Sequence, residues 1–329
     1  MSESLISIII PVLNGSKFLV RCFDTLEKQL YSNLEVIFID NGSEDDSKEI
    51  IKNQCSIKKN YYLIECNIPG PGAARNIGIK FSKGEYISFL DVDDELKPDK
   101  HHILIEGFKS YPKAAMVVGN TSKIYSDGRE VMLNLGPLNV GLNEPPKAGF
   151  LWLQQFQHHP HINSMLIKKQ SILHVNGIPE NMFMGFVNGE DIALSVKIGM
   201  ENEIILIDKL VCIYHRHNES AVTKANQVLS VTERFFQFHE KFALPYFYEK
   251  KHMEPFKRAY YLCDNIAYKM LMKLIKDEKR SSYIKILKDL QSNLFISRSF
   301  LRKLFFSIFP YNIANYLHQK FYRYSKYHF

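Results

Sequence analysis

Cysteine is scarce in this sequence, which has five cysteines in 329 residues and no C-x-x-C pair. That number and spacing argue against a disulfide framework and against a zinc site, and they fit a reducing cytoplasm. No segment reaches the roughly 18 apolar residues that a membrane-spanning helix needs. The first residues, MSESLISIIIPVLNG, also lack the basic stretch and cleavage site of a signal peptide, so their apolar run predicts a strand.

Glycine-rich loops that hold phosphates are missing as well. The turn after the first predicted strand reads PVLNGS from Pro11, which matches neither G-x-G-x-x-G nor G-x-x-x-x-G-K-[ST]. This argues against dinucleotide and P-loop sites. Internal repeats and low-complexity linkers are missing too, and 46% hydrophobic with 23% charged residues describe an ordinary globular protein.

Acidic residues are nearly absent from the C-terminal region. From Lys279 onward there are ten Lys or Arg residues and one acid, Asp289, which gives a charge of +9. Because the whole chain has a net charge of +7, the first 278 residues sum to −2. A negatively charged partner would therefore bind to the C-terminal region.

Strand and helix patterns alternate in the first third of the chain. Apolar runs predict strands at 5–13, 34–39, 61–66 and 86–90. The stretches between them predict helices at 17–30, from Ser43 to about Cys55, and from Ala73. This alternation is typical of an α/β fold with a parallel sheet that helices cover on both faces. Ligands of such sheets lie beyond the carboxyl ends of the strands, where the polar clusters fall: Asn14, Asp40 to Ser43, Asn67, and Asp91 to Asp94.

Beyond residue 115 the pattern is looser. Strands are predicted at 114–119 and 205–214, and a short helix is predicted at 187–200. From about residue 226 onward the pattern is nearly all helical, with breaks at three prolines. The change of pattern places a boundary between two regions near residue 225.

The stretch YISFLDVDD at 86–94 ends an apolar run in three carboxylates, those of Asp91, Asp93 and Asp94. Carboxylates crowded at the end of a buried strand repel one another, and a divalent cation such as Mg2+ or Mn2+ relieves that repulsion. The alternative is a solvated acidic turn in which Asp94 caps the following helix. These residues alone support both interpretations equally.

Six ordered motifs resemble those of family 2 glycosyltransferases with the GT-A fold. They are SIIIPVLN, EVIFIDNGSEDDS, NIPGPGAARNIGI, FLDVDDEL, GEDIAL and YHRHNESAVT, between about residues 5 and 223. The resemblance implies an α/β fold, with a mostly parallel sheet flanked by helices and an α-helical C-terminal extension. It implies a catalytic domain at 1–225, with a nucleotide half up to about 115 and an acceptor half from 116. Residues 226–329 would form a helical, basic region outside it.

The resemblance also implies roles for the residues that nucleotide-binding motifs contain. Pro11 and Asn14 would border the nucleotide pocket, and Asp40 would pair with the base. Arg75 would line the nucleotide side of the site, and Asn67, one of the polar strand ends, is expected to bind the nucleotide-sugar as well. Two departures from the usual motifs stand out, Asn41 in place of a second Asp and His215 in place of an Arg. The first is expected to change only turn hydrogen bonds, and the second weakens the expectation of diphosphate contacts from that loop.

For the reacting groups, the resemblance implies that Asp91 contacts the ribose or a metal and that Asp93 holds Mn2+ or Mg2+. His217 would contact the diphosphate or the metal. Asp191 would be the catalytic base, with Glu190 beside it against the nucleotide-sugar. The chemistry agrees, because a cation on Asp93 would stabilise charge building on the leaving diphosphate. A carboxylate on the opposite side of the sugar can take the acceptor proton. One base without a separate nucleophile predicts inversion at the anomeric carbon.

The predicted function is thus an inverting, metal-dependent glycosyltransferase of the hexosyl or N-acetylhexosaminyl class. It would move a sugar from a nucleotide-sugar, taken to be a UDP-sugar, to a glycan or a lipid-linked saccharide in surface polysaccharide synthesis. Two alternatives are a nucleotide-sugar-binding protein without turnover and a nucleotidyltransferase. The donor sugar, the acceptor and the oligomeric state stay open.

Some of these features have simpler interpretations when taken alone. A Glu–Asp pair such as Glu190 and Asp191 usually marks a helix start, and Arg75 would usually form an exposed ion pair. His158, His159 and His161 are interrupted by a proline and have no evident fourth ligand, so we expect histidines of the surface or of an acceptor groove. Trp152, the only tryptophan, is expected in the core.

The C-terminal region contains two predicted helices, 297–309 and 312–327, which combine aromatic and basic residues. One interpretation is that they pack on the catalytic domain with their charges in solvent. We favour the other, in which they lie on an anionic membrane where a lipid-linked acceptor waits. Nucleic-acid binding is not supported by any recognised module. The expected location is the cytoplasm, including a peripheral position on the inner face of the plasma membrane.

Overall fold

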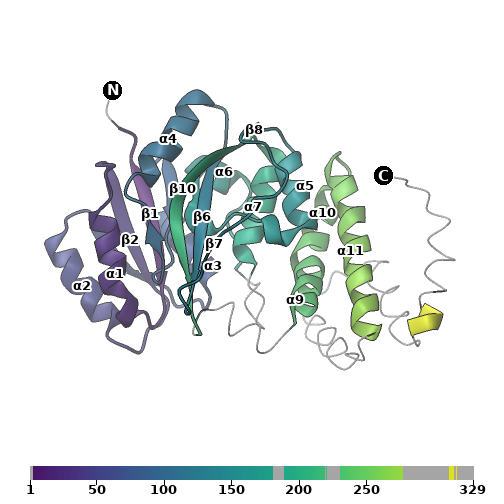
Figure 1. Ribbon diagram of the computed structural model, residues 1–329, viewed down its shortest axis with the longest axis horizontal. Coiled ribbons are helices and arrows are strands. Elements are labelled where there is room, and N and C mark those ends of the chain that lie inside the picture. Colours follow the sequence, from purple (N-terminus) through teal and green to yellow (C-terminus); the bar gives the residue numbers. More distant parts are fainter. Residues whose placement is uncertain are drawn as a thin grey trace. The chain divides into compact units, whose positions relative to one another are not determined.

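The chain forms two compact units, one of residues 1–183 with 189–223 and the other of residues 184–188 with 224–329 (Figure 1). The computed structural model describes residues 3–180, 189–218, 220, 230–276, 311–314 and 316. The first unit contains a ten-stranded sheet and the helices that cover it. The described part of the second unit is helical.

Four parallel strands form one side of the sheet in the order β3-β2-β1-β4. Their bounds are Ile6–Val12 for β1, Leu34–Asp40 for β2, Tyr61–Glu65 for β3 and Tyr86–Phe89 for β4. Strands β1, β2 and β4 are buried on both faces, which is why they read as continuous apolar runs without alternation. The four strands predicted in this region are confirmed.

The other side of the sheet is mixed. Strand β9 (Met165–Lys168) runs antiparallel to both β4 and β6 (Met116–Tyr125), and β10 (Ile204–Arg216) then pairs parallel with β6. Three short strands complete it: β5 (Glu95–Leu96), β7 (Glu130–Met132) and β8 (Gly141–Asn143). Because β9 reverses direction, the residues that precede it lie at the carboxyl end of β4.

Helices cover both faces of the sheet, as predicted. Buried side chains of α1 (Ser16–Glu27), α2 (Ser47–Ile57) and α4 (Lys100–Ser110) share one core with Ile8 of β1. Helix α3 (Pro71–Phe81) lies on the other face, where Gly78 allows close contact because a Cβ there would lie 2.4 Å from Ile9. Helix α2 begins at Ser47, so its predicted start at Ser43 was wrong. Asp45 precedes the helix and accepts hydrogen bonds from the N–H groups of Ser16 and Ser47.

Two helices of the second half pack against each other at glycines. Helix α5 (Lys147–Gln154) meets α7 (Glu190–Glu201) where Gly149 lies against Gly199, close enough that neither position has room for a Cβ. Trp152 of α5 is fully buried, which confirms its predicted place in the core. Between α5 and α7 come the short helices η1 (Phe156–His158), η2 (Ile162–Ser164) and α6 (Lys169–His174).

The second unit contains α9 (Val231–Phe238), a π-helical turn (His239–Ala243), α10 (Leu244–Lys250) and α11 (Phe256–Lys276). A reciprocal pair of hydrogen bonds between Ser230 and Glu233 caps the start of α9. No helix of the described part is long and apolar enough to cross a membrane. The predicted helix 297–309 and most of 312–327 lie outside the described residues.

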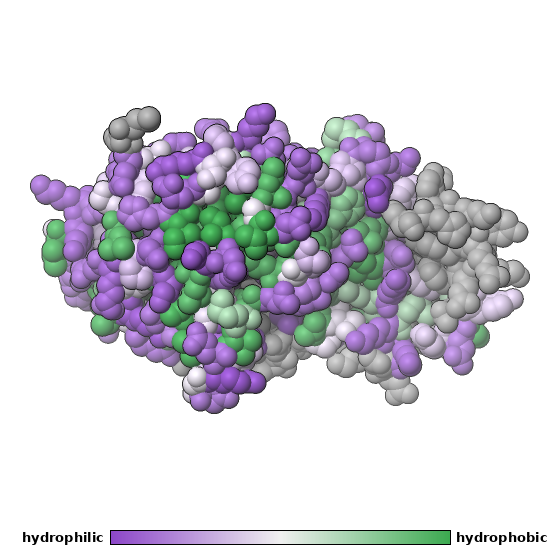
Figure 2. Space-filling model, turned by 45° about the horizontal axis from the view of Figure 1, so that its top comes forward, coloured by the Kyte–Doolittle hydropathy of each residue, from purple (hydrophilic) through white to green (hydrophobic). Residues whose placement is uncertain are grey.

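The surface of the sheet-containing unit is mostly hydrophilic on the face that Figure 2 displays, with one apolar area in its middle. Large apolar side chains that the described part exposes include those of Leu13, Val131, Met132 and Val140. Single exposed apolar side chains are normal for a globular protein.

Candidate functional site

The loops after β1 and β2 are joined by hydrogen bonds. The N–H of Asn14 donates to Ser43 Oγ (3.0 Å), and Asn14 Oδ1 accepts from the N–H of Glu44 (2.8 Å). Asn14 has a positive φ of 50°, which asparagine tolerates better than most residues. These bonds fix the loop next to Pro11, the half-buried residue of β1 that was predicted to border a nucleotide.

Asp40, the residue predicted to pair with a base, ends β2 with its side chain buried. Its two carboxylate oxygens accept long hydrogen bonds, of 3.3 and 3.4 Å, from the N–H of Ser43. Asn67, predicted on the same side, is exposed and makes no side-chain hydrogen bond within the described residues. Asp40 is thus held by its turn, whereas the amide of Asn67 is open to solvent.

Asn41 stabilises the turn that leads into α3. Its Nδ2 donates to the carbonyl oxygens of Cys66 (3.0 Å) and Ile68 (2.7 Å), and its Oδ1 accepts from the N–H of Gly70 (2.8 Å). Gly70 has a φ of 112°, a conformation that favours glycine. An aspartate at position 41 could accept the last bond but could not donate the first two. The departure at Asn41 therefore changes turn hydrogen bonds, as predicted.

The three acids after β4 occupy different environments. The side chains of Asp91 and Asp93 are 28% and 21% exposed, whereas that of Asp94 is 1% exposed. Asp94 Oδ1 accepts from the N–H of His215 (2.8 Å), and Oδ2 accepts from Asn163 Nδ2 (2.7 Å). Burial, followed by repulsion from the other two carboxylates, raises the pKa of Asp94 well above its ordinary value.

The prediction that Asp94 caps the next helix was wrong. Helix α4 begins at Lys100 after Asp99, and the two-residue strand β5 separates it from Asp94. A cap accepts from N–H groups of its own helix, but Asp94 accepts from Asn163 and His215 instead. Asp94 therefore joins three segments that are distant in the sequence.

Asp93 and His217 lie in direct contact. Asp93 Oδ2 is 2.8 Å from His217 Nε2, and the imidazole ring packs against Phe18, with ring centroids 4.9 Å apart. Burial, followed by repulsion from Asp91, raises the pKa of Asp93, while the bond to His217 opposes this shift. Both side chains are about a quarter exposed, so an ion from solvent can reach them.

Arg75 is a buried ion-pair partner of two carboxylates, and the simpler interpretation as an exposed ion pair was wrong. Its side chain is 4% exposed, with Nη2 2.6 Å from Asp91 Oδ1 and Nη1 2.6 Å from Glu190 Oε1. Burial disfavours the charged guanidinium, but Asp91, Glu190 and Asp191 outweigh it and raise the pKa of Arg75. Its Nε has no hydrogen-bond partner within the described part of the chain.

Helix α7 begins with the two predicted acids, Glu190 and Asp191. Asp191 Oδ1 accepts from the N–H of Ile192 (2.8 Å), which fixes its carboxylate at the first turn. Burial raises the pKa of Asp191, although Arg75 opposes the shift. Burial, followed by repulsion from Asp191, raises the pKa of Glu190 in the same way. These carboxylates are therefore stronger bases than exposed ones.

His161 is not a surface histidine, so of the two predicted alternatives, a surface position and an acceptor groove, only the groove stays a prediction for it. Its side chain is 16% exposed and stacks on Tyr214, with ring centroids 4.7 Å apart. Burial lowers the pKa of His161 to about 4 and that of His159 to about 3, so both rings are neutral at physiological pH. His159 Nε2 lies 3.0 Å from Ser195 Oγ, which donates to the carbonyl oxygen of Asp191.

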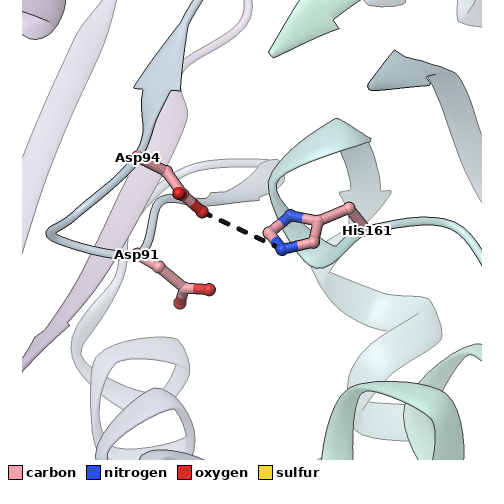
Figure 3. A group of neighbouring side chains, drawn as sticks. All are labelled: Asp91, Asp94 and His161. Atoms are coloured by element: carbon pink, nitrogen blue, oxygen red, sulfur yellow. Dashed lines mark ion pairs between the residues drawn. The ribbon is translucent and has the colours of Figure 1, made fainter. Parts of the chain in front are cut away.

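Asp91, Asp94 and His161 point toward one another in Figure 3. One ligand atom of each lies within 4.8 Å of the others, so the group could hold a metal ion. His161 Nε2 is 3.8 Å from Asp94 Oδ2. However, Asp94 already accepts two hydrogen bonds and Asp91 is paired with Arg75, so a cation there would have to displace existing partners. Asp93 and His217 offer a partly exposed carboxylate and imidazole that bond only to each other among these groups, a donor set that fits a divalent cation.

The structure thus brings six predicted site residues into one connected group, namely Arg75, Asp91, Asp93, Glu190, Asp191 and His217. The other four predicted residues, Pro11, Asn14, Asp40 and Asn67, lie at the ends of β1 to β3. Sequence reasoning missed two polar residues of the group, His161 and Asn163. The available indication was the stretch HPHINS directly before the three apolar residues MLI, which resembles the other polar strand ends.

Comparison with known proteins identifies the family. The family model described as glycosyl transferase family 2 matches residues 7–172, just over half of the chain. Glycosyltransferase GlyG of Streptococcus pneumoniae serotype 4 is 38% identical over 121 residues, which are 36% of this chain and 40% of GlyG. This chain therefore spans less than half the length of that relative.

Two solved structures are similar in fold. TarS from S. aureus in complex with UDP-GlcNAc gives a TM-score of 0.61 at 18% identity, over 83% of this chain and 73% of TarS. The mannosyltransferase PcManGT from Pyrobaculum calidifontis, in complex with GDP-Man and Mn2+, gives 0.51 at 14% identity, over 97% of this chain and 87% of that one. These likenesses confirm the predicted α/β fold of the GT-A type. The family match, the ordered motifs and this fold agree, and the chain belongs to glycosyl transferase family 2.

Proposed function

We propose that this chain is an inverting, metal-dependent glycosyltransferase that moves a sugar from a UDP-sugar to a glycan or lipid-linked saccharide. The observation that carries the proposal is the bridge made by Arg75. One guanidinium pairs with Asp91 of the acidic turn and with Glu190, the neighbour of the proposed base. The bridge holds the metal side and the base side of a transfer reaction next to each other.

Asp93 and His217 would hold the cation, and the choice of metal follows from their chemistry. An imidazole nitrogen beside a carboxylate suits Mn2+ better than Mg2+, which prefers oxygen ligands alone. When bound, the cation would neutralise negative charge on the leaving diphosphate. The raised pKa of Asp93 supports this role, because a nearby positive charge relieves its repulsion from Asp91.

Asp191 would accept the proton of the acceptor hydroxyl. Burial raises the pKa of its carboxyl, which makes it a better proton acceptor, and the positive charge of Arg75 opposes this rise. No nucleophilic carboxylate besides this base is needed, so the sugar is displaced directly and its anomeric configuration inverts. Glu190 is engaged by Arg75 and would position the start of α7.

The loops around Pro11, Asn14, Asp40 and Asn67 would receive the nucleotide. The UDP-GlcNAc complex of TarS supports a UDP-sugar, and the GDP-Man complex of PcManGT makes a guanine nucleotide the alternative to test. The donor sugar would be a hexose or an N-acetylhexosamine. A nucleotide-sugar-binding protein without turnover and a nucleotidyltransferase are the competing functions that an activity assay separates.

The test is nucleotide release with Mn2+ across a panel of UDP- and GDP-sugars, with saccharide acceptors. Release of UDP from one donor is expected, and no release from any donor and acceptor would contradict the proposal. Asp191→Asn should keep the Kd for UDP within about twofold and lower transfer at least 100-fold, in line with loss of a general base. Asp127→Asn changes a mostly exposed turn residue and should leave both values unchanged. Loss of UDP affinity in Asp191→Asn would mean that Asp191 has another role.

A further inference from the structure

Asn163 connects the acidic turn to the rest of the site. Its side chain is fully buried. Its Nδ2 donates to Asp94 Oδ2 (2.7 Å), and its Oδ1 accepts from the N–H of Asp91 (3.1 Å). One amide thus satisfies a buried carboxylate and an N–H of the same four-residue turn, which fixes the turn at both ends.

The reversed direction of β9 brings Asn163 to this place. Ser88 of β4 pairs with Leu166 of β9 in antiparallel register. Residues just before β9 therefore lie beside residues just after β4, although Asn163 and Asp94 are 69 positions apart in the sequence. The short helix η2 holds Asn163 in position, because Ser164 Oγ donates to the carbonyl oxygen of His161 (2.7 Å).

Asp94 also links the acidic turn to the end of β10. Its second oxygen accepts from the N–H of His215 (2.8 Å), and the ring of His215 lies 2.7 Å from Glu95 Oε1. Two residues farther along, His217 contacts Asp93. The end of β10 is thus attached to the acidic turn through the carboxylate that Asn163 holds.

We propose that Asn163 is a positioning residue, which with Asp94 forms a clamp that sets the geometry of Asp93 and His217 for a divalent cation. The inference rests on the proposed function, in which these two residues hold the metal. Without the amide, the carboxylate of Asp94 loses one of its two donors, which is costly because this carboxylate is fully buried. The turn then relaxes, and the spacing of Asp93 and His217 changes with it.

The first experiment removes the amide and measures metal affinity rather than activity. Asn163→Leu has nearly the same shape and lacks both hydrogen bonds. We expect the Kd for Mn2+, measured by EPR titration of the full chain with UDP present, to rise at least 10-fold, as for other residues that support metal ligands. Asn143→Leu is the matched control, since Asn143 is also buried and bonds to Asn139 and Gly141 at the start of β8. It should lower the melting temperature but leave the Kd for Mn2+ unchanged.

The second experiment exchanges the two partners. In the double variant Asp94→Asn/Asn163→Asp, the amide at position 94 can donate to the new carboxylate and still accept from the N–H of His215. The carboxylate at position 163 can still accept from the N–H of Asp91. Every hydrogen bond of the clamp is kept and the net charge is unchanged, so we expect the double variant to bind Mn2+ at least fivefold more tightly than either single variant.

Two results would overturn the clamp. One is a folded Asn163→Leu protein whose Kd for Mn2+ stays within twofold of the natural protein. The other is a folded double variant that binds Mn2+ no better than its two single variants, which decides the question even if Asn163→Leu does not fold. If the proposed function itself is wrong, the natural protein would bind no Mn2+ with UDP present. This result is distinct from the two that overturn the clamp.

Discussion

Arg75 compensates only part of the negative charge that surrounds it. Its single guanidinium pairs with Asp91 and Glu190, and Asp191 lies near enough to raise its pKa further. Asp93 lies close enough to Asp91 for the two carboxylates to repel each other, so the group keeps an excess of negative charge. Such an excess is costly in the free protein, and a bound cation lowers that cost.

Lys100 is the most unusual charged residue outside this group. It is fully buried, and its Nζ donates to Ser88 Oγ (2.8 Å), which also contacts His101 Nε2 (3.0 Å). Burial lowers the pKa of Lys100 from 10.5 to about 7. The unfolded chain therefore binds more protons than the folded chain between about pH 7 and 10.5, so the free energy of unfolding rises with pH over that window.

Replacing this amine tests the argument. Lys100→Met keeps the volume and removes the charge, so we expect the free energy of unfolding to increase by about 1 to 3 kcal/mol near neutral pH. The gain over the natural protein should shrink as the pH rises toward the ordinary pKa of lysine. Urea denaturation at several pH values measures both effects. Lys109→Met, an exposed change on the same helix, should give no pH-dependent difference. A loss of stability in Lys100→Met would mean that the amine is needed in the core.

The sequence predicts the acids of the site better than their individual roles. Asp91, Asp93 and Asp94 are recognisable as a cluster, because three carboxylates follow an apolar run. Which of them is buried depends on the direction of each side chain in a tight turn and on partners far along the chain. Asn163 and His215 decide the outcome for Asp94, and neither lies within 60 residues of it.

At the level of elements, the strands with long apolar runs are predictable and the short ones are not. Strands β1 to β4 have runs that no helix pattern matches, and their parallel order follows from the alternation with helices. Strand β9 has four residues, too few for a periodic pattern, yet it lies between β4 and β6 and makes the sheet mixed. Its direction brings Asn163 to the acidic turn.

The contact of α5 with α7 yields a prediction for an element. A Cβ at Gly199 would lie 2.8 Å from the backbone N of Gly149 and 3.0 Å from Cζ3 of Trp152. Backbone atoms cannot rotate away, so Gly199→Ala should force the helices apart and lower the free energy of unfolding by about 1 to 3 kcal/mol. This lowering is the net effect, after the gain of about 1 kcal/mol that alanine in place of glycine brings to a helix. Urea denaturation decides, and a more stable variant would contradict the tight contact.

At the level of the whole molecule, charge is divided between two parts of the chain. The first 278 residues sum to −2, whereas the rest carries +9. Composition predicts this division without any structure, but it does not identify the surface on which the positive charge acts. Most of the basic region lies outside the described residues, so the membrane hypothesis stays a prediction.

Truncation tests that hypothesis directly. Removing residues 297–329 deletes six Lys or Arg residues and no acid. Each basic residue contributes about 1 kcal/mol of attraction to an anionic surface, so the truncated protein should move from the pellet to the supernatant when sedimented with anionic vesicles. Vesicles of neutral lipid and high salt are the controls, since both remove the attraction. Unchanged sedimentation after truncation would contradict the membrane hypothesis.

The partners of the acidic turn are far from it along the chain, and this has a consequence for synthesis. Asp93 and His217 are 124 positions apart, and Arg75 and Glu190 are 115 apart. Contacts of such separation form late, because the chain between them must first be ordered. A nascent chain that has emerged only as far as Asp94 already carries these acids but has none of the later partners. Under the proposed function, donor binding should therefore begin only after β10 has left the ribosome.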